Sequence, residues 1–328
     1  MARLGVLFPG QGSQYVGMGR DLFRQFETAR ACFEEARAAL GSDIGRLCFE
    51  GPREALDLTE NTQAATLTLE IAAWRVLERE TGVRPSAMAG HSLGEYGALC
   101  AAGALGFADT LRLVRKRASL QQEAVPPGVG ANAAIQGLGR ETIEGLCREV
   151  SGDAGLVSPS CYNAPDQTVV SGHTAPVEAV MAKALAAGAR RALMLPLSAP
   201  FHCALLEGAA RRFGDALGEI DFRDGAVPVI PNCDPEALHS AASTRDLLIR
   251  QIHQPVRWIE TIERMAAMGI DTVIEVGPKR VLSALALQIN RTLRVLNVEN
   301  LDSLERTADL LSKSAPPRGR TGCSKRPG

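Results

Sequence analysis

Short apolar runs that alternate with helical patterns constrain this chain more than any other feature of its sequence. Strands are predicted where such runs are closed by glycine or proline, at residues 4–8, 85–90, 227–231 and 271–276. Helices are predicted from the spacing of apolar side chains, at residues 20–40, 62–80, 93–104, 109–124 with Asp109 as the cap, 203–218, 243–252, 255–268 and after Pro278. Strands that alternate with helices form largely parallel sheets covered on both faces. We therefore expect an α/β fold.

Residues 131–197 follow a different order of elements. Strands and helices are predicted there in the order β-α-β-β-α-β, at 131–138, 140–151, 156–163, 168–172, 174–188 and 190–197. This order is that of a ferredoxin-like unit. We expect a large α/β domain formed by residues 1–127 and 199–312, an inserted small domain at 128–198 and a disordered tail at 313–328.

Composition excludes several classes of function. The net charge of −1 and the aromatic content of 4% do not indicate binding to nucleic acid or to an anionic membrane surface. The eight cysteines form no C-x-x-C pair, which favours buried reduced thiols over disulfides or a metal site. The first apolar run, at residues 4–8, is too short for a signal peptide. These features predict a cytoplasmic protein.

The sharpest local motif is Gly90-His91-Ser92-Leu93-Gly94, which fits the pattern G-x-S-x-G. A predicted strand precedes it and a predicted helix follows it, as the nucleophile turn of this pattern requires. Glycine at 90 and 94 lets backbone pass close by, so that the Ser92 hydroxyl reaches the carboxyl edge of the sheet. The Leu93 N–H faces the same point and is placed to donate to a developing oxyanion. A chance match in an ordinary turn is the alternative.

A serine at neutral pH needs a base, and histidine is the usual one. His202 is the best candidate because it lies where the chain re-enters the large domain, beside the expected cleft. His91 is expected to point away from the serine beside it. The remaining histidines belong to no supporting motif: His173, His239 and His253. No aspartate occupies an obvious orienting position, so a backbone carbonyl or an amide side chain is expected to fix the tautomer of the base.

Together these segments resemble the malonyl-CoA:acyl carrier protein transacylase family. The matching stretches lie in order over nearly the whole chain: LFPGQGSQYVGMG (7–19), NTQAA (61–65), GHSLGEYGAL (90–99), FADTLRLVRKRASLQQEAVPPG (107–128), YNAPDQTVVSG (162–172), SAPFHCALL (198–206), QPVRW (254–258) and EVGPKRVL (275–282). The resemblance implies an α/β-hydrolase-like large domain with a ferredoxin-like insert, in agreement with the pattern of elements.

The resemblance also implies a role for individual residues. Ser92 would carry the acyl group, and His202 would take up and return its proton. The backbone carbonyl of Gln251 would orient His202, which fits the missing aspartate. Gln11 and Leu93 would supply the two backbone N–H groups of an oxyanion hole.

A run of cations on one predicted helix contains the expected substrate anchor. The run consists of Arg112, Arg115, Lys116 and Arg117. Such a run usually lies on a solvated helix face, and the residues alone do not show which member points inward. The resemblance selects Arg117 to hold the free carboxylate of malonate, with Gln63 supporting it by hydrogen bonding. A planar guanidinium matches a carboxylate bidentately.

Further positions are given supporting roles. His91 is one of them, and Asn163 and Gln167 are expected to position the two domains around His202. Glu95, in the first turn of its helix, is interpreted as a capping and dipole partner.

Three positions depart from the usual family pattern. Gln121 and Asn132 stand where methionine is expected, and Ala64 stands where proline is expected. Because positions 121 and 132 are expected to line the acyl pocket, they leave the acyl specificity open. Phe201 leaves little room for an α-substituent, which favours malonyl over methylmalonyl.

The predicted reaction is a ping-pong transfer of malonyl from malonyl-CoA to the phosphopantetheine thiol of holo-acyl carrier protein in fatty-acid synthesis. The CoA thioester is a substrate, and no metal or redox cofactor is implied. Basic side chains are expected to guide an acidic carrier: Arg190, Arg191, Lys279 and Arg280.

Several alternative functions are retained. Within the family, they are a stand-alone acyltransferase of a polyketide pathway and the malonyltransferase subunit of a decarboxylase. Outside it, a serine thioesterase or other hydrolase shares the G-x-S-x-G motif but has no need of Arg117. A dinucleotide-binding protein is disfavoured because the glycine loop fails G-x-G-x-x-G at Tyr15, and a non-catalytic scaffold has no need of the serine, histidine and arginine together.

Overall fold

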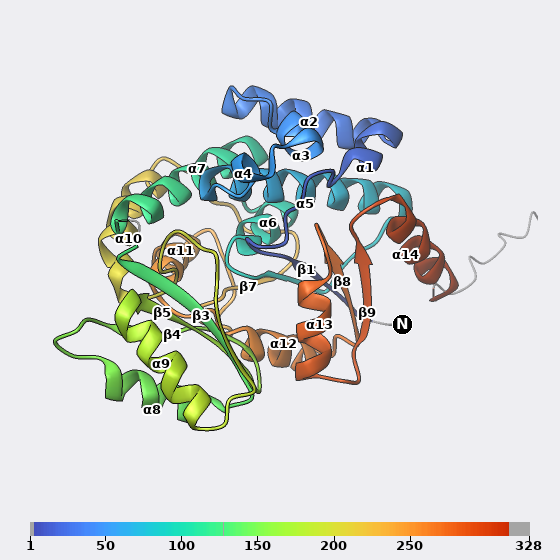
Figure 1. Cartoon of the computed structure of the whole chain (residues 1–328). Coiled ribbons are helices and arrows are strands. Elements are labelled where there is room, and N and C mark those ends of the chain that lie inside the picture. Colours follow the sequence, from blue (N-terminus) through green and yellow to red (C-terminus); the bar gives the residue numbers. More distant parts are fainter. Residues whose placement is uncertain (1–2, 127, 315–328) are drawn as a thin grey trace, which may run out of the picture.

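The computed structural model describes residues 3–126 and 128–314, which form two β-sheets (Figure 1). Sheet A is parallel, in the order β7-β2-β1-β8-β9: β1 (Leu4–Phe8), β2 (Ala87–Gly90), β7 (Val229–Ile230), β8 (Thr272–Val276) and β9 (Arg294–Val298). Sheet B is antiparallel, in the order β4-β5-β3-β6: β3 (Gly130–Gln136), β4 (Val157–Ala164), β5 (Gln167–His173) and β6 (Arg191–Met194). The predicted fold class, a mostly parallel sheet with a separate ferredoxin-like unit, is confirmed.

Helices cover both faces of sheet A. The helices that precede sheet B in the chain are α1 (Arg20–Gln25), α2 (Glu27–Leu40), α3 (Ile44–Glu50), α4 (Arg53–Leu56), α5 (Thr59–Thr81), α6 (Gly94–Ala101) and α7 (Phe107–Ala124). Those after it are the 3-10 turn η1 (Ala204–Leu206), α10 (Glu207–Leu217), α11 (Thr244–His253), α12 (Trp258–Ala267), α13 (Val281–Ile289) and α14 (Leu301–Ser314). Helices α5 and α6 pack on one face, and α12 and α13 lie on the other (Figure 1).

Alternation along the strands of sheet A explains its two buried faces. Val6 and Phe8 of β1 belong to the core beneath α5 and α6, whereas Leu7 between them belongs to the core beneath α12 and α13. Successive side chains of a strand point to opposite faces, so a strand buried on both sides is apolar throughout. That is why the run at residues 4–8 has no polar side chain.

Sheet B is joined to the rest of the structure at its edge strand β4. Helices α8 (Arg140–Val150) and α9 (Thr174–Ala186) pack on one face of the sheet around a separate small core. At the edge, β4 pairs with the segment before α12: the Val256 N–H donates to the Ser160 carbonyl at 2.8 Å, and the Tyr162 N–H donates to the Val256 carbonyl at 2.9 Å. These bonds fix sheet B against the part of the chain that follows α11.

Some elements differ from the predictions. The helix expected at 20–40 is interrupted at Phe26, whose backbone is extended (φ −115°, ψ 127°) while its side chain packs against the core. Gly106 rather than Asp109 caps α7, and Asp109 lies inside the first turn. Four elements were not predicted: α3, α4, β9 and α14. Helix α14 includes residues 313 and 314 of the expected tail, and residues 315–328 lie outside the described part of the chain.

No helix among the described residues is both long enough and apolar enough to cross a membrane.

Candidate active site

The turn between β2 and α6 forces Ser92 into a strained conformation. Its φ is 54°, in the left-handed region that side chains other than glycine rarely adopt. Neighbouring backbone passes so close that a Cβ at Gly90 would lie 1.9 Å from the Gly94 carbonyl, and a Cβ at Gly94 would lie 1.9 Å from the Phe8 carbonyl oxygen. The two glycines of the motif are therefore required sterically. The Ser92 N–H donates to Asn232 Oδ1 at 2.6 Å, which helps to hold the turn.

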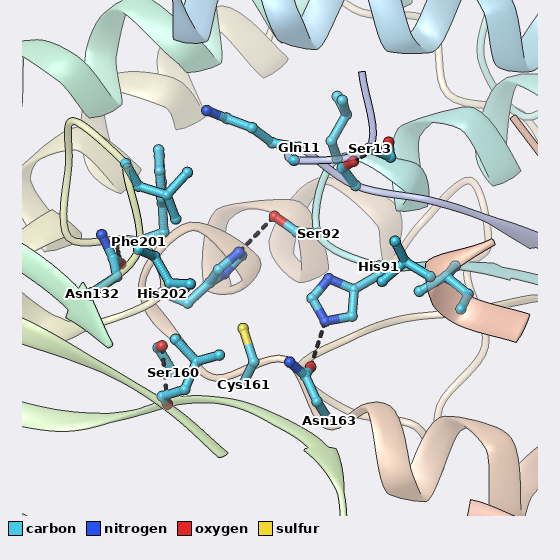
Figure 2. Close-up of a pocket in the computed structure, with 18 of the residues that line it drawn as sticks. Gln11, Ser13, His91, Ser92, Asn132, Ser160, Cys161, Asn163, Phe201 and His202 are labelled. Carbon is cyan, nitrogen blue, oxygen red and sulfur yellow. Dashed lines mark hydrogen bonds between the residues drawn. The ribbon is translucent and has the colours of Figure 1, made fainter. Parts of the chain in front are cut away.

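His202 meets Ser92 although 110 residues separate them (Figure 2). The distance from Ser92 Oγ to His202 Nε2 is 2.6 Å. His202 Nδ1 lies 2.8 Å from the backbone carbonyl oxygen of Gln251, which can only accept a hydrogen bond. Nδ1 must therefore carry the proton, and the free lone pair of Nε2 accepts the Ser92 hydroxyl. This is the arrangement of a serine activated by a general base.

Burial keeps that base neutral. His202 is 2% exposed, and loss of solvent together with the nearby charge of Arg117 lowers the pKa of His202 to about 3. Its φ of 57° is also in the left-handed region, so both members of the pair have strained backbones. Strain of this kind persists only where the surrounding structure fixes it, and it clusters at functional sites.

Arg117, on α7, is the cation that points inward. Its side chain is 1% exposed, and its guanidinium donates to Gln63 Oε1 at 2.9 Å, to Gln251 Oε1 at 3.1 Å and to Ser92 Oγ at 3.2 Å. None of the ion pairs formed within the described residues includes Arg117. Burial lowers the pKa of Arg117, because the loss of water outweighs the favourable charge of nearby Glu95, with which the guanidinium forms no ion pair. An anion is therefore the group that this position lacks.

A cavity of about 250 Å³ connects these side chains and is bounded by both sheets. Ser92, His202 and Arg117 line its floor, together with Gln11 and Leu93. Within the described part of the chain, the backbone N–H groups of Gln11 and Leu93 donate to no other group, so both can donate to an oxygen in the cavity. Apolar side chains close much of the remaining wall: Val169, Leu195, Leu197, Phe201, Val281, Leu282 and Leu285.

Two of the expected supporting residues meet across the cavity. His91 Nε2 lies 2.8 Å from Asn163 Oδ1, so that the nucleophile turn is joined to β4 (Figure 2). Gln167 also lines the cavity, but its side chain accepts from Gln136 in the neighbouring strand at 3.2 Å. That bond lies within sheet B and does not join the two parts of the chain, and the positioning role expected for Gln167 stays a prediction.

Cys161 adds a thiol to the cavity wall. In Figure 2 its sulfur points toward the space between His202 and His91. Burial raises the pKa of Cys161 to about 12, so the thiol stays protonated at neutral pH. Because the thiolate is the reactive form of cysteine, Cys161 does not compete with Ser92 as a nucleophile.

A buried network behind Ser92 was missed by the sequence analysis. Glu95, fully buried, accepts from the Asn232 N–H at 2.8 Å and from Gln251 Nε2 at 3.2 Å, and lies 2.8 Å from His239 Nε2. Asn232 and Gln251 in turn bond the backbone N–H and carbonyl of Ser92. Interpreting Glu95 as a cap of its own helix was wrong, since its partners lie in other elements.

One signal in the sequence points to part of this network. Asn232 lies two residues after the end of β7, at the same carboxyl edge of sheet A from which Ser92 projects. Polar residues at that edge are the ones that open α/β sheets use for ligands. His239 carries no comparable signal, because it lies in an irregular segment and reaches Glu95 only through the folding of residues 231–243.

The two polar residues at expected methionine positions occupy different places. Gln121 lies behind the arginine, where its Oε1 accepts from Gln63 Nε2 at 3.1 Å. Asn132 lines the cavity and bonds the segment that leads into His202.

Comparison with known proteins gives consistent matches over nearly the whole chain. Residues 6–308 match the acyl transferase domain family. The chain is 45% identical over 293 residues to the malonyl CoA-acyl carrier protein transacylase of Salmonella typhimurium, covering 89% of this chain and 94% of that protein. The solved structure of that transacylase from Coxiella burnetii matches with a TM-score of 0.92 at 40% identity, covering 94% and 98% of the two chains. A solved complex of a type II PKS acyl-carrier protein with its malonyl-transacylase matches with a TM-score of 0.92 at 42% identity, covering 94% and 100%.

Proposed function

This chain belongs to the acyl transferase domain family, and we propose that it transfers a malonyl group from malonyl-CoA to the phosphopantetheine thiol of an acyl carrier protein, in fatty-acid synthesis. The relatives named as malonyl CoA-acyl carrier protein transacylases support this assignment at up to 45% identity. The transfer runs through an ester on Ser92 and has two half-reactions.

Arg117 is the observation that carries the choice of substrate. A buried guanidinium without a carboxylate partner faces the cavity beside the Ser92 hydroxyl. Malonyl-CoA has a free carboxylate at the end of its acyl group, which would replace the Nη2 bond to Ser92 Oγ and neutralise the cation. Acetyl-CoA lacks that carboxylate and would leave the charge buried and unpaired, which is costly in a dry site.

In the first half-reaction, Ser92 Oγ attacks the thioester carbonyl carbon as its proton passes to His202 Nε2. The N–H groups of Gln11 and Leu93 stabilise the oxyanion. The C–S bond then breaks, and the imidazolium returns the proton to the departing CoA sulfur. The Gln251 carbonyl holds the ring throughout, which leaves a malonyl ester on Ser92.

In the second half-reaction, the thiol of the carrier's phosphopantetheine arm gives its proton to His202 Nε2 and attacks the ester carbonyl. The C–O bond breaks, and Ser92 Oγ recovers the proton. Water is the competing nucleophile, so the apolar wall around the cavity favours transfer over hydrolysis by limiting access of water.

An acidic carrier fits the basic side chains near the cavity mouth. Lys279 and Arg280 are exposed and directly precede Val281 and Leu282, which line the cavity. Arg190 lies close to Gln167 in a neighbouring hollow, and is ion-paired with Asp166. Opposite charge across such a contact raises the rate of association and fixes the register of the partners.

The residues of this site supply a nucleophile, a base, an oxyanion hole and an anion anchor, so we propose that the reaction proceeds without a metal or redox cofactor. We also place it in the cytoplasm, because the seven cysteines of the described residues are free thiols and a reducing compartment preserves such thiols.

A labelling experiment separates transfer from hydrolysis. The protein is mixed with malonyl-CoA labelled in the malonyl group, and holo-acyl carrier protein is then added. Label that stays on the protein and then moves to the carrier supports the proposal. Release of free malonate at the same rate with and without the carrier would identify a thioesterase instead.

A further inference from the structure

Residues 199–202, here called the His202 segment, follow sheet B in the chain and bring two side chains to the cavity. Phe201 and His202 both line it, and His202 has the strained φ of 57° described above. The side chain of a residue in that conformation is aimed correctly only if the preceding backbone is held firmly.

Asn132, on β3, holds this segment with one amide group. Its Nδ2 donates to the Ala199 carbonyl at 2.7 Å, and its Oδ1 accepts from the Phe201 N–H at 3.0 Å. Figure 2 shows Asn132 beside Phe201. The amide therefore pairs with backbone on both sides of Pro200, as a neighbouring strand would do. Pro200 itself packs so closely on Gly130 that a Cβ there would lie 2.6 Å from the proline ring.

A third bond fixes the orientation of that amide. Ser171 Oγ, on β5, lies 2.7 Å from Asn132 Oδ1 and 2.7 Å from Ser160 Oγ on β4. Asn132 is 1% exposed, so its amide has no water to replace a lost partner. A flipped amide would turn its NH₂ toward the Phe201 N–H and its oxygen toward the Ala199 carbonyl, which would place two donors and two acceptors face to face. A single orientation satisfies all of these groups.

We propose that Asn132 is a positioning residue that sets both the rate of acyl transfer and the size of the acyl group that is accepted. Through the Phe201 N–H it holds the aromatic ring that limits space beside the substrate's α-carbon, and through the whole segment it holds the imidazole at Ser92. This inference rests on the proposed function. It assigns a specific task to a polar side chain at a position where methionine, with only a weak acceptor, was expected.

The test uses two variants and one matched control. Asn132→Leu keeps the branched shape and the number of side-chain heavy atoms but removes the amide, and Asn132→Met restores the residue expected from the family pattern. Ser171→Ala removes the third bond and the contact with Ser160, and it leaves both bonds to the His202 segment. Rapid-quench intact-mass measurements give the rate and the half-saturating concentration for acylation of Ser92 by malonyl-CoA and by methylmalonyl-CoA, and thermal melts identify any variant that does not fold.

Both Asn132 variants are expected to lower the maximal acylation rate with malonyl-CoA by about tenfold or more, as loss of two buried hydrogen bonds implies, with little change in half-saturation. The ratio of methylmalonyl to malonyl acylation is expected to rise in both, while Ser171→Ala keeps the wild-type ratio. A wild-type rate and ratio in both folded variants would overturn the inference, and a lower rate at an unchanged ratio would overturn its specificity half. Failure of the wild-type protein to form any malonyl ester would instead overturn the proposed function.

Discussion

At the scale of the residue, the site depends on a cation that the fold leaves without a counter-ion. Arg117 contacts two amide side chains and the Ser92 hydroxyl, and all three are neutral partners. The amides orient the guanidinium without neutralising it, so its charge remains available for a substrate. Selectivity for a dicarboxylic acyl group follows from this arrangement.

Arg117→Ala is expected to reduce kcat/KM for malonyl-CoA by an amount equivalent to roughly 2–5 kcal/mol, the usual cost of truncating one member of a buried charge pair. The rate with acetyl-CoA is expected to fall much less, because that substrate has no carboxylate to lose. Steady-state kinetics with both thioesters measures the change in preference. An unchanged preference for malonyl-CoA would show that Arg117 is not the anchor.

The pKa of His202 predicts how the reaction depends on pH. The base acts only when its imidazole is neutral, and burial beside Arg117 lowers its pKa from the ordinary value near 6.5 to about 3. The folded protein therefore keeps the neutral base as the pH falls through 6.5. The pH dependence of kcat/KM for malonyl-CoA reports the pKa values of the free enzyme. We expect it to show no inflection between pH 6 and pH 7, the range that brackets the pKa of a free histidine side chain. An inflection there would contradict the burial argument.

Sequence patterns located the cavity residues that belong to continuous motifs and missed the residues that only the fold brings to the site. The G-x-S-x-G spacing identified Ser92, and the resemblance selected Arg117 from a run of cations that spacing alone could not order. His239 and the task of Glu95 were missed, because their bond joins residues that are 144 positions apart and belong to no common pattern.

At the scale of the element, the buried pair of Glu95 and His239 ties together the pieces that hold the nucleophile turn. His239 Nδ1 lies 3.1 Å from Thr244 Oγ1, whose own hydrogen is donated to the Ser240 carbonyl, so both ring nitrogens face acceptors. Helix α6 is thereby joined to β7 and to α11.

Glu95→Gln is expected to lower the free energy of unfolding by about 3 kcal/mol, because one of the two buried acceptor oxygens shared by Asn232, Gln251 and His239 becomes a donor. Acylation of Ser92 should slow as well, since the network that holds the Ser92 backbone loses one of these acceptors. Urea unfolding provides the measurement. Glu34→Gln, which breaks an exposed ion pair with Arg37, is the control and should change stability by less than about 1 kcal/mol. Equal stability of the two variants would refute the structural role of the pair.

Element boundaries could be predicted only where the apolar periodicity extends over enough residues to be recognised. The order of elements in sheet B was correct because glycine or proline lies in or close to each junction between a strand and the next element. The short helices α3 and α4 were missed because they have only 7 and 4 residues, fewer than the apolar periodicity needs. Strand β9 was missed because it is an edge strand of mixed exposure.

At the scale of the whole molecule, function arises where the two sheets meet. Sheet A supplies the nucleophile turn, sheet B supplies Asn132, Cys161 and Asn163, and the segment between them supplies His202. Neither sheet alone closes the cavity. The residue limits proposed for the two domains, 1–127 with 199–312 and 128–198, stay predictions.

The most direct test of the central claim is to locate the acyl group after mixing the protein with malonyl-CoA in the absence of carrier. Intact mass followed by peptide mapping should show one malonyl group per chain, on Ser92. The adduct should persist in Cys161→Ala and be absent from Ser92→Ala. An adduct that survives loss of the serine, or that maps to Cys161, would contradict covalent transfer through Ser92.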